Sequence, residues 1–283
     1  MARASAGETV LGKHLRVLGA FEASVPFLSL SQRAARAGLA PSTAHRIVAE
    51  LEREGLLERL PDRTYRLGMR LWELACRTPG ALGLRELARP HLDHVHARVQ
   101  QHAQIGVLSG TEVLFLDRLS ARNAVVNATL IGGRIPLYAS STGLVLLAHA
   151  GQDVVDEVVR AGFRRFTDET IQTEADLHAA LRGVRADGWA ECGGHIHAES
   201  RGIAVPVYGS HHEVIAAIGV VIAHDGSSPL GYIELLMRAA RDISAAMRSA
   251  SLPAGHPAAS PGGRLRPLVT SSLRSMEYLA SQL

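Results

Sequence analysis

Three residues that bind metal ions in many proteins lie close together in the sequence. Cys192, His195 and His197 fall within one short stretch, and thiolate and imidazole groups are typical ligands of zinc and other soft metal ions. The chain contains 14 histidines, so the same residues also fit a polar loop or strand edge. The large number of histidines favours this ordinary interpretation. No metal and no cofactor is predicted, and a metal-responsive site stays as an alternative.

Two side chains are candidates for covalent catalysis. Ser141 and Cys192 could act as nucleophiles, but the sequence shows no partner base for either. The motifs GxSxG and GxxxxGK[ST] are absent, as is a GxGxxG that opens a helix after a strand. His212-Glu213 begins like a zinc-protease motif, but Ala216 stands where the second histidine would be. The sequence therefore favours a protein that is not an enzyme, with an enzyme carrying an added basic domain as the alternative.

A third group of residues has the chemistry of DNA contacts. The segment that follows Pro41 begins with short hydroxyl residues and then a basic side chain, and Arg46 could pair with a guanine or a phosphate. An arginine-bearing hairpin follows and could lie along the neighbouring DNA backbone or minor groove. The alternative is a three-helix module for protein contacts with solvated polar faces. The candidate DNA-contacting residues are Ser31, Ser42, Thr43, His45, Arg46, Arg59, Arg63 and Arg66.

The spacing of apolar residues predicts the helices and strands that position these side chains. Apolar residues recur at helical intervals in 10–21 and again in 41–54. Between them, Ser29 and Gln32 form a capping-box pattern that opens a short helix ending at Gly38. Residues 56–68 read as two short strands around a turn. The order of helix, tight turn, second helix and basic hairpin is that of a winged helix-turn-helix, which places its second helix in the major groove.

Composition agrees with two domains of different charge. Residues 1–85 hold 13 basic and 8 acidic residues, and the remainder holds 17 and 19; a basic small domain beside a nearly neutral larger one suits nucleic-acid binding, although a solvated surface would look the same. Cys76 and Cys192 form no CxxC pair, and neither a secretory signal nor a membrane-spanning run is found. We expect a cytoplasmic protein without membrane contact.

The larger part of the chain alternates strand and helix patterns, which predicts an α+β domain. Strands are expected at 104–108, 112–119, 125–131, 203–208 and 214–223, and helices at 141–149, 152–161, 173–187 and 232–248. Two connector helices, interrupted near Thr78-Pro-Gly80, are expected between 69 and 101. The predicted organisation is a DNA-binding domain at 8–68, a linker helix at 69–88, a second domain at 89–249, and a flexible linker with a tail helix at 250–283.

The sequence resembles the IclR family of bacterial transcriptional regulators from about residue 8 to 248. The resemblance implies a winged helix-turn-helix, a linker helix that helps dimerisation, and an effector-binding domain related to the GAF fold with an antiparallel sheet. It also implies homodimers that can pair into homotetramers on palindromic double-stranded operators, acting as repressors or activators. The matching stretches are Ser29–Leu39, Ser42–Arg46, Leu51–Leu56, Tyr65–Gly68, Gly133–Gly143, Gly188–Ala190 and Arg201–Pro206.

The resemblance also places a small-molecule pocket. In relatives with small carboxylate effectors, polar groups that hold the ligand fall here on Ser141, Thr142, Cys192, Gly202, Gly219 and Val221. Ser141 and Thr142 begin a predicted helix, whose free amide groups suit an anion. The glycines and the valine offer no hydrogen-bonding side chain, and Cys192 replaces a carboxylate. We therefore expect an effector larger or less polar than glyoxylate, such as an aromatic or lipid-like compound.

Overall fold

The computed structural model describes residues 9–22, 25–76 and 81–250. Its contacts divide the chain into two units, residues 1–78 and 79–283, and each unit is described by itself. The part of the prediction that concerns a linker and tail helix after residue 250 falls outside the described residues, as does the Thr78-Pro-Gly80 interruption. No helix of the described segments is long and apolar enough to cross a membrane.

The first unit is a winged helix-turn-helix, as predicted. Its core contains Val17, Ile47, Val48 and Leu57, which come from three of its elements. Its elements are α1 (Val10–Gly19), α2 (Leu30–Arg36), α3 (Pro41–Arg53), the antiparallel pair β1 (Leu57–Arg59) and β2 (Tyr65–Leu67), and α4 (Met69–Cys76).

Local sequence signals fix the helix boundaries of this unit. The predicted capping box at the start of α2 is present, because the Ser29 side chain accepts from the Gln32 amide while Gln32 Oε1 accepts from the Ser29 amide at 2.8 Å. Pro41 occupies the first turn of α3, where a missing amide costs no hydrogen bond. Gly55 follows the end of α3 with φ +71°, a conformation that glycine adopts without strain.

The second unit is built on a six-stranded sheet. Every neighbouring pair is antiparallel, and the strand order is β5-β4-β3-β8-β7-β6. The strands are β3 (His102–Ser109), β4 (Glu112–Ser120), β5 (Arg134–Pro136), β6 (Ala190–Gly193), β7 (Ser200–Tyr208) and β8 (Val214–Ala223). The helices are α5 (Ala81–Val99), the 3-10 turn η1 (Leu137–Ala139), α6 (Ser141–Ala148), α7 (Gln152–Ala161), α8 (Glu174–Asp187) and α9 (Leu230–Ala250).

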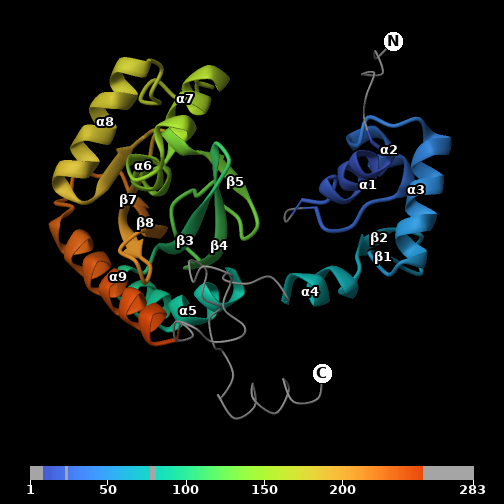
Figure 1. The fold of residues 1–283 in the computed structure, drawn as a ribbon, viewed down its shortest axis with the longest axis horizontal. Helices are drawn as coiled ribbons and strands as arrows, with labels where there is room; N and C mark the ends of the chain where they lie inside the picture. The colour runs from blue at the N-terminus through green and yellow to red at the C-terminus, as the bar shows by residue number, and fades with distance from the viewer. Residues whose placement is uncertain (1–8, 23–24, 77–80, 251–283) are drawn as a thin grey trace. The chain divides into compact units, whose positions relative to one another are not determined.

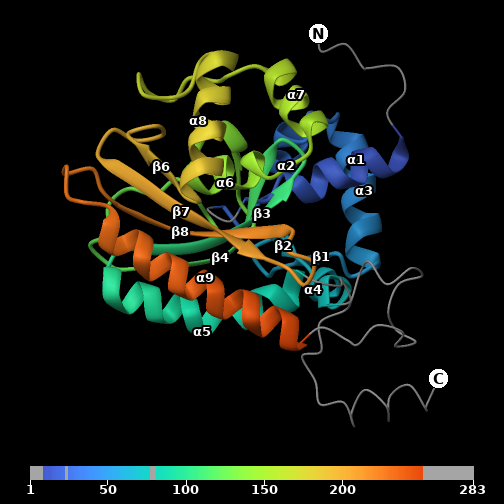
Figure 2. The same ribbon diagram turned by 60° about the vertical axis from the view of Figure 1, so that its left-hand side comes forward.

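Helices cover both faces of this sheet. Helices α5 and α9 lie along one face, and α6, α7 and α8 lie on the other (Figures 1 and 2). Each face has its own apolar core, one centred on residues such as Leu147 and Leu177 and the other on residues such as Leu92 and Leu236. Side chains alternate between the two cores along a strand, as Ile203 and Ala204 do on β7. The α+β class with an antiparallel sheet is confirmed.

One predicted strand is wrong. Residues 121–131 form no strand, and we call this stretch the strap. Side chains from the sheet take its backbone groups: Gln101 Oε1 accepts from the Val125 amide at 2.9 Å, and Ser200 donates to the Val126 carbonyl at 2.6 Å. Arg118 donates to the Thr129 carbonyl. These side chains satisfy backbone groups that would otherwise pair with a neighbouring strand. The strap therefore covers the sheet without joining it, although its apolar residues alternate as in a strand.

Candidate functional site

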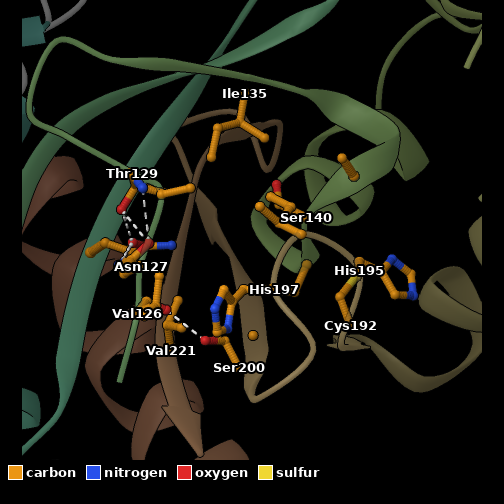
Figure 3. Close-up of a pocket in the computed structure, with 16 residues that line it drawn as sticks. Val126, Asn127, Thr129, Ile135, Ser140, Cys192, His195, His197, Ser200 and Val221 are labelled. Atoms are coloured by element: carbon orange, nitrogen blue, oxygen red, sulfur yellow. Dashed lines mark hydrogen bonds between the residues drawn. The ribbon is translucent and has the colours of Figure 1, made fainter. Parts of the chain in front are cut away.

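A pocket lies in the second unit, between the sheet, the strap and the N-terminal end of α6 (Figure 3). Its empty volume, which includes space open to solvent, is about 450 Å³. The apolar lining includes Val126, Ile135, Ala139, Ile196 and Val221.

The start of α6 borders the pocket at Ser140 and Ser141, and we call this region the anion-binding pole for the chemistry that it offers. The Ser140 side chain caps the helix by accepting from the Gly143 amide at 3.1 Å. The backbone amides of Ser141 and Thr142 have no hydrogen-bond acceptor within the described chain. Two free amides at the positive end of a helix dipole suit a carboxylate.

Six residues were predicted from the sequence to contact the effector, and four of them line this pocket. Ser141, Cys192, Gly202 and Val221 form part of its wall, and Thr142 and Gly219 are not among the lining residues. Gly202 lies directly against Ser141, because a Cβ atom at Gly202 would sit 2.8 Å from the Ser141 hydroxyl oxygen. The Thr142 hydroxyl is fully buried without a hydrogen-bond partner, and a Cβ at Gly219 would lie 3.3 Å from it. These last two residues therefore pack beside each other.

Sequence reasoning missed the polar residues on the other side of the pocket. Gln104 of β3 and Asn127 and Thr129 of the strap line it, and they are joined by hydrogen bonds (Figure 3). Because residues 125–131 were predicted to form a strand, their side chains were not expected to line the pocket. The one signal in the sequence was the Asn-x-Thr spacing, since asparagine side chains often bond to the backbone two residues further on.

The metal-responsive alternative is not supported. Among the described residues no group of three or more His, Cys, Asp or Glu side chains could hold a metal ion. The rings of His195 and His197 lie apart and do not converge (Figure 3). Burial raises the pKa of the Cys192 thiol well above its usual value, and the nearby Glu191 adds to this effect. A buried thiol that stays protonated is a poor metal ligand and a poor nucleophile.

The histidines instead belong to the pocket wall. Burial lowers the pKa of His195, although Glu169 opposes the shift, and the ring stays neutral near pH 7. Its carbonyl oxygen accepts from the hydroxyl groups of Thr167 and Thr170, which anchors the loop. The Nδ1 atom of His197 is buried without a protein partner.

The predicted DNA-contacting residues lie in the first unit. Ser42, His45 and Arg46 are exposed on α3, and Thr43 is half-buried. Arg46 forms an ion pair with Glu50 one turn along the helix, at 2.6 Å. The remaining predicted residues, Ser31, Arg59, Arg63 and Arg66, are also exposed. The Ser31 hydroxyl lies 3.0 Å from the Ser29 hydroxyl, and Arg66 pairs with Glu58 at 2.9 Å.

A buried arginine, which the sequence did not reveal, supports the hairpin. Arg33 of α2 is fully buried, and its guanidinium carbon lies 3.8 Å from the centre of the Tyr65 ring. Burial lowers the pKa of Arg33, and the interaction with Tyr65 partly opposes this shift. The cation–π contact therefore connects α2 to the first residue of β2.

A winged helix-turn-helix and a separate domain with a small-molecule pocket define a ligand-controlled transcriptional regulator. Two family models match the chain, the IclR helix-turn-helix domain over residues 10–61 and the bacterial transcriptional regulator IclR C-terminal domain over residues 77–245. The protein belongs to the IclR family of DNA-binding transcriptional regulators, and its C-terminal domain binds the effector.

Named relatives agree with this assignment. An IclR homologue from Microbacterium hydrocarbonoxydans, solved in complex with 4-hydroxybenzoate, is 41% identical with a TM-score of 0.80, over 85% of this chain and 100% of that one. The transcriptional regulator XynR of Escherichia coli is 28% identical over 73% of this chain and 82% of its own length. The Pca regulon regulatory protein of Pseudomonas putida is 28% identical over 83% of this chain and 82% of its own.

Proposed function

We propose that the effector is a monocyclic aromatic carboxylate, larger and less polar than glyoxylate, and that it controls operator binding. The proposal rests on one observation, that polar groups and apolar side chains occupy different parts of the pocket. Amide groups at the start of α6 form one pole, and side chains such as Ile135 and Val221 form apolar walls. Such walls bind a ring better than a two-carbon acid. The 4-hydroxybenzoate bound to the Microbacterium homologue agrees with this class of ligand.

The effector class is tested by isothermal titration of the full-length protein. We expect benzoate or a hydroxybenzoate to bind at least tenfold more tightly than glyoxylate, because burying an aromatic ring contributes about 1.5–3 kcal/mol. The methyl ester of the same acid is the matched control. It keeps the ring but loses the charge that the Ser141 amide at the start of α6 would bind, so it should bind more weakly. Tight glyoxylate binding with no response to aromatic acids would overturn the proposal.

We propose that the exposed side of α3 from Ser42 to Arg46 enters the major groove of the operator. The short side chain of Ser42 lets the N-terminal end of the helix approach the phosphates, and Arg46 is long enough to reach a base edge. Arg59, Arg63 and Arg66 of the hairpin would hold the adjacent DNA backbone, and Ser31 would contact a phosphate from α2. In this proposal the protein acts in the cytoplasm, and it is a regulator and not an enzyme.

A second copy of the chain is the proposed partner of the exposed apolar side chains on α4 and of those on α1. Leu11 is 66% exposed and Trp72 is 63% exposed, and Val10, Leu15, Met69 and Leu74 are also exposed. Large apolar side chains exposed along a short helix are costly in water and typical of a subunit interface. A homodimer would also match the two-fold symmetry of a palindromic operator. Pairing of dimers into tetramers would add a second contact.

The dimer is tested by replacing Trp72 with glutamate. A charge in the interface should weaken dimerisation by about 2 kcal/mol or more, since aromatic residues dominate such interfaces. The measurement is light scattering after size-exclusion chromatography across a dilution series. Glu73→Gln, on the same exposed helix, is the control and should leave the mass unchanged. An unchanged oligomer in Trp72→Glu would contradict this interface.

A further inference from the structure

Gln104 combines deep burial with a position in the pocket wall. The residue lies in the middle of β3, is 3% exposed, and lines the pocket. Its Oε1 atom accepts from Asn127 Nδ2 at 3.1 Å and lies 2.7 Å from the Thr129 hydroxyl. The side-chain oxygen of Gln104 therefore accepts hydrogen bonds from the strap.

The backbone of the strap determines which way both amide side chains point. The Thr129 backbone N–H donates to Asn127 Oδ1 at 3.0 Å. A backbone N–H can only donate, so the oxygen of Asn127 must face it and Nδ2 must face Gln104. Because Nδ2 is also a donor, Gln104 must present its oxygen to Asn127. The Nε2 group of Gln104 is then left on the other side of the amide.

This Nε2 group has two N–H bonds and no hydrogen-bond partner among the residues that the structure describes. Gln104 Nε2 is not one of the fully buried polar atoms that lack a partner, so it is open to solvent in the pocket. A ligand that displaces this solvent must supply an acceptor, or the donor loses its hydrogen bond. Asn127 and Thr129, which hold the other end of the same amide, lie across the pocket from Ser140 at the start of α6 (Figure 3). Gln104 is bonded to both of them and lines the pocket beside the strap, and its Nε2 group is the part of the amide that the strap leaves free.

We infer that Gln104 is a specificity-determining residue that donates a hydrogen bond to an oxygen on the effector ring, remote from its carboxylate. The inference rests on the proposed aromatic carboxylate effector. A phenolic oxygen accepts a hydrogen bond from the amide, whereas an unsubstituted ring leaves the donor unpaired and a ring amino group is mainly a donor itself. The pocket then selects hydroxybenzoates over benzoate and over aminobenzoates.

His195 and His197 are the competing polar groups. The Nδ1 atom of each is buried without a hydrogen-bond partner, and both residues line the same pocket (Figure 3). A histidine nitrogen can donate or accept depending on its tautomer, so no protein contact fixes its role as the strap fixes that of Gln104. The experiment therefore includes a variant of each residue.

The test compares dissociation constants for benzoate, 3- and 4-hydroxybenzoate and 4-aminobenzoate by isothermal titration of the full-length protein. In the wild type, at least one hydroxybenzoate should bind about tenfold to a hundredfold more tightly than benzoate and 4-aminobenzoate. Gln104→Met should reduce this preference to about twofold or less while benzoate affinity is retained. Gln104→Glu keeps an acceptor for Asn127 and Thr129 but removes the donor, so it should lose the preference even if Gln104→Met folds poorly.

Two controls separate the possible results. Arg122→Ala changes an exposed residue of the strap that does not line the pocket, so the preference should persist. If no benzoate binds, the proposed effector class fails. If benzoates bind without preference for an oxygen, only the role of Gln104 fails. A preference that survives in both Gln104 variants and disappears in His195→Phe or His197→Phe would assign the contact to that histidine and overturn the inference.

Discussion

Replacing Arg46 with alanine is expected to weaken operator binding by about 1–3 kcal/mol for each half-site, and a dimer that uses two copies would lose about 2–6 kcal/mol. The Arg46 side chain is 59% exposed on α3, and its guanidinium group pairs with Glu50 at 2.6 Å. A hydrogen bond from His14 and the pairing with Arg46 lower the pKa of Glu50, so this carboxylate stays ionised and holds the arginine in place. The side chain is thus pre-oriented on the surface proposed to enter the groove.

The measurement is fluorescence anisotropy with the operator duplex over a series of salt concentrations. An arginine that pairs with a base should lose discrimination between the operator and unrelated duplex, whereas a phosphate contact should only reduce the salt dependence. Arg53→Ala is the control, because Arg53 is 73% exposed at the end of the same helix and lies outside the proposed surface. Unchanged affinity in Arg46→Ala would contradict the placement of the reading helix.

Replacing Gly143 with alanine should destabilise the effector domain by about 3–5 kcal/mol. Gly143 lies in the first turn of α6, where all eight residues are buried. A Cβ atom there would sit 2.1 Å from the Leu137 carbonyl oxygen and 2.7 Å from its Cα atom. Backbone cannot yield as a flexible side chain does, so α6 would have to move away from η1. The pocket would lose its anion-binding pole with that movement.

Thermal unfolding of the full chain checks this expectation. A loss of this size should lower the midpoint of the effector-domain transition by about 6–20 °C. Gly183→Ala is the matched control: this glycine lies within α8 with no atom within 4 Å of an added Cβ. Alanine there should stabilise the helix by about 0.5–1 kcal/mol. Equal effects of the two substitutions would show that Gly143 does not hold α6 against η1.

Much of the DNA-binding unit was predictable because its signals are local. The capping box at Ser29, the proline at Pro41 and the glycine at Gly55 each act within a few residues. Apolar spacing also gave helices α7 and α8 and strand β8 almost to the residue. The short strands β5 and β6 were not predicted, since three or four residues carry too little periodicity.

The effector pocket was predictable only in part. Helix α6 was recognisable, so Ser141 could be placed at its start, and Gly202 and Val221 were placed through family resemblance. The strap was misread because it has the apolar alternation of a strand. Its conformation depends on side chains of Gln101, Arg118 and Ser200, which are distant in sequence.

By itself the sequence determined the helices, the basic hairpin and the family of this protein, because capping, turn chemistry and helical periodicity act over three or four neighbouring residues. Only the tertiary structure decided which atoms meet in the pocket. Gln104 and Asn127 are 23 residues apart, and the orientation of the Gln104 amide follows from one backbone N–H of the strap. Such a hydrogen-bond chain exists only after the strap has folded over the sheet, so no local pattern can record it.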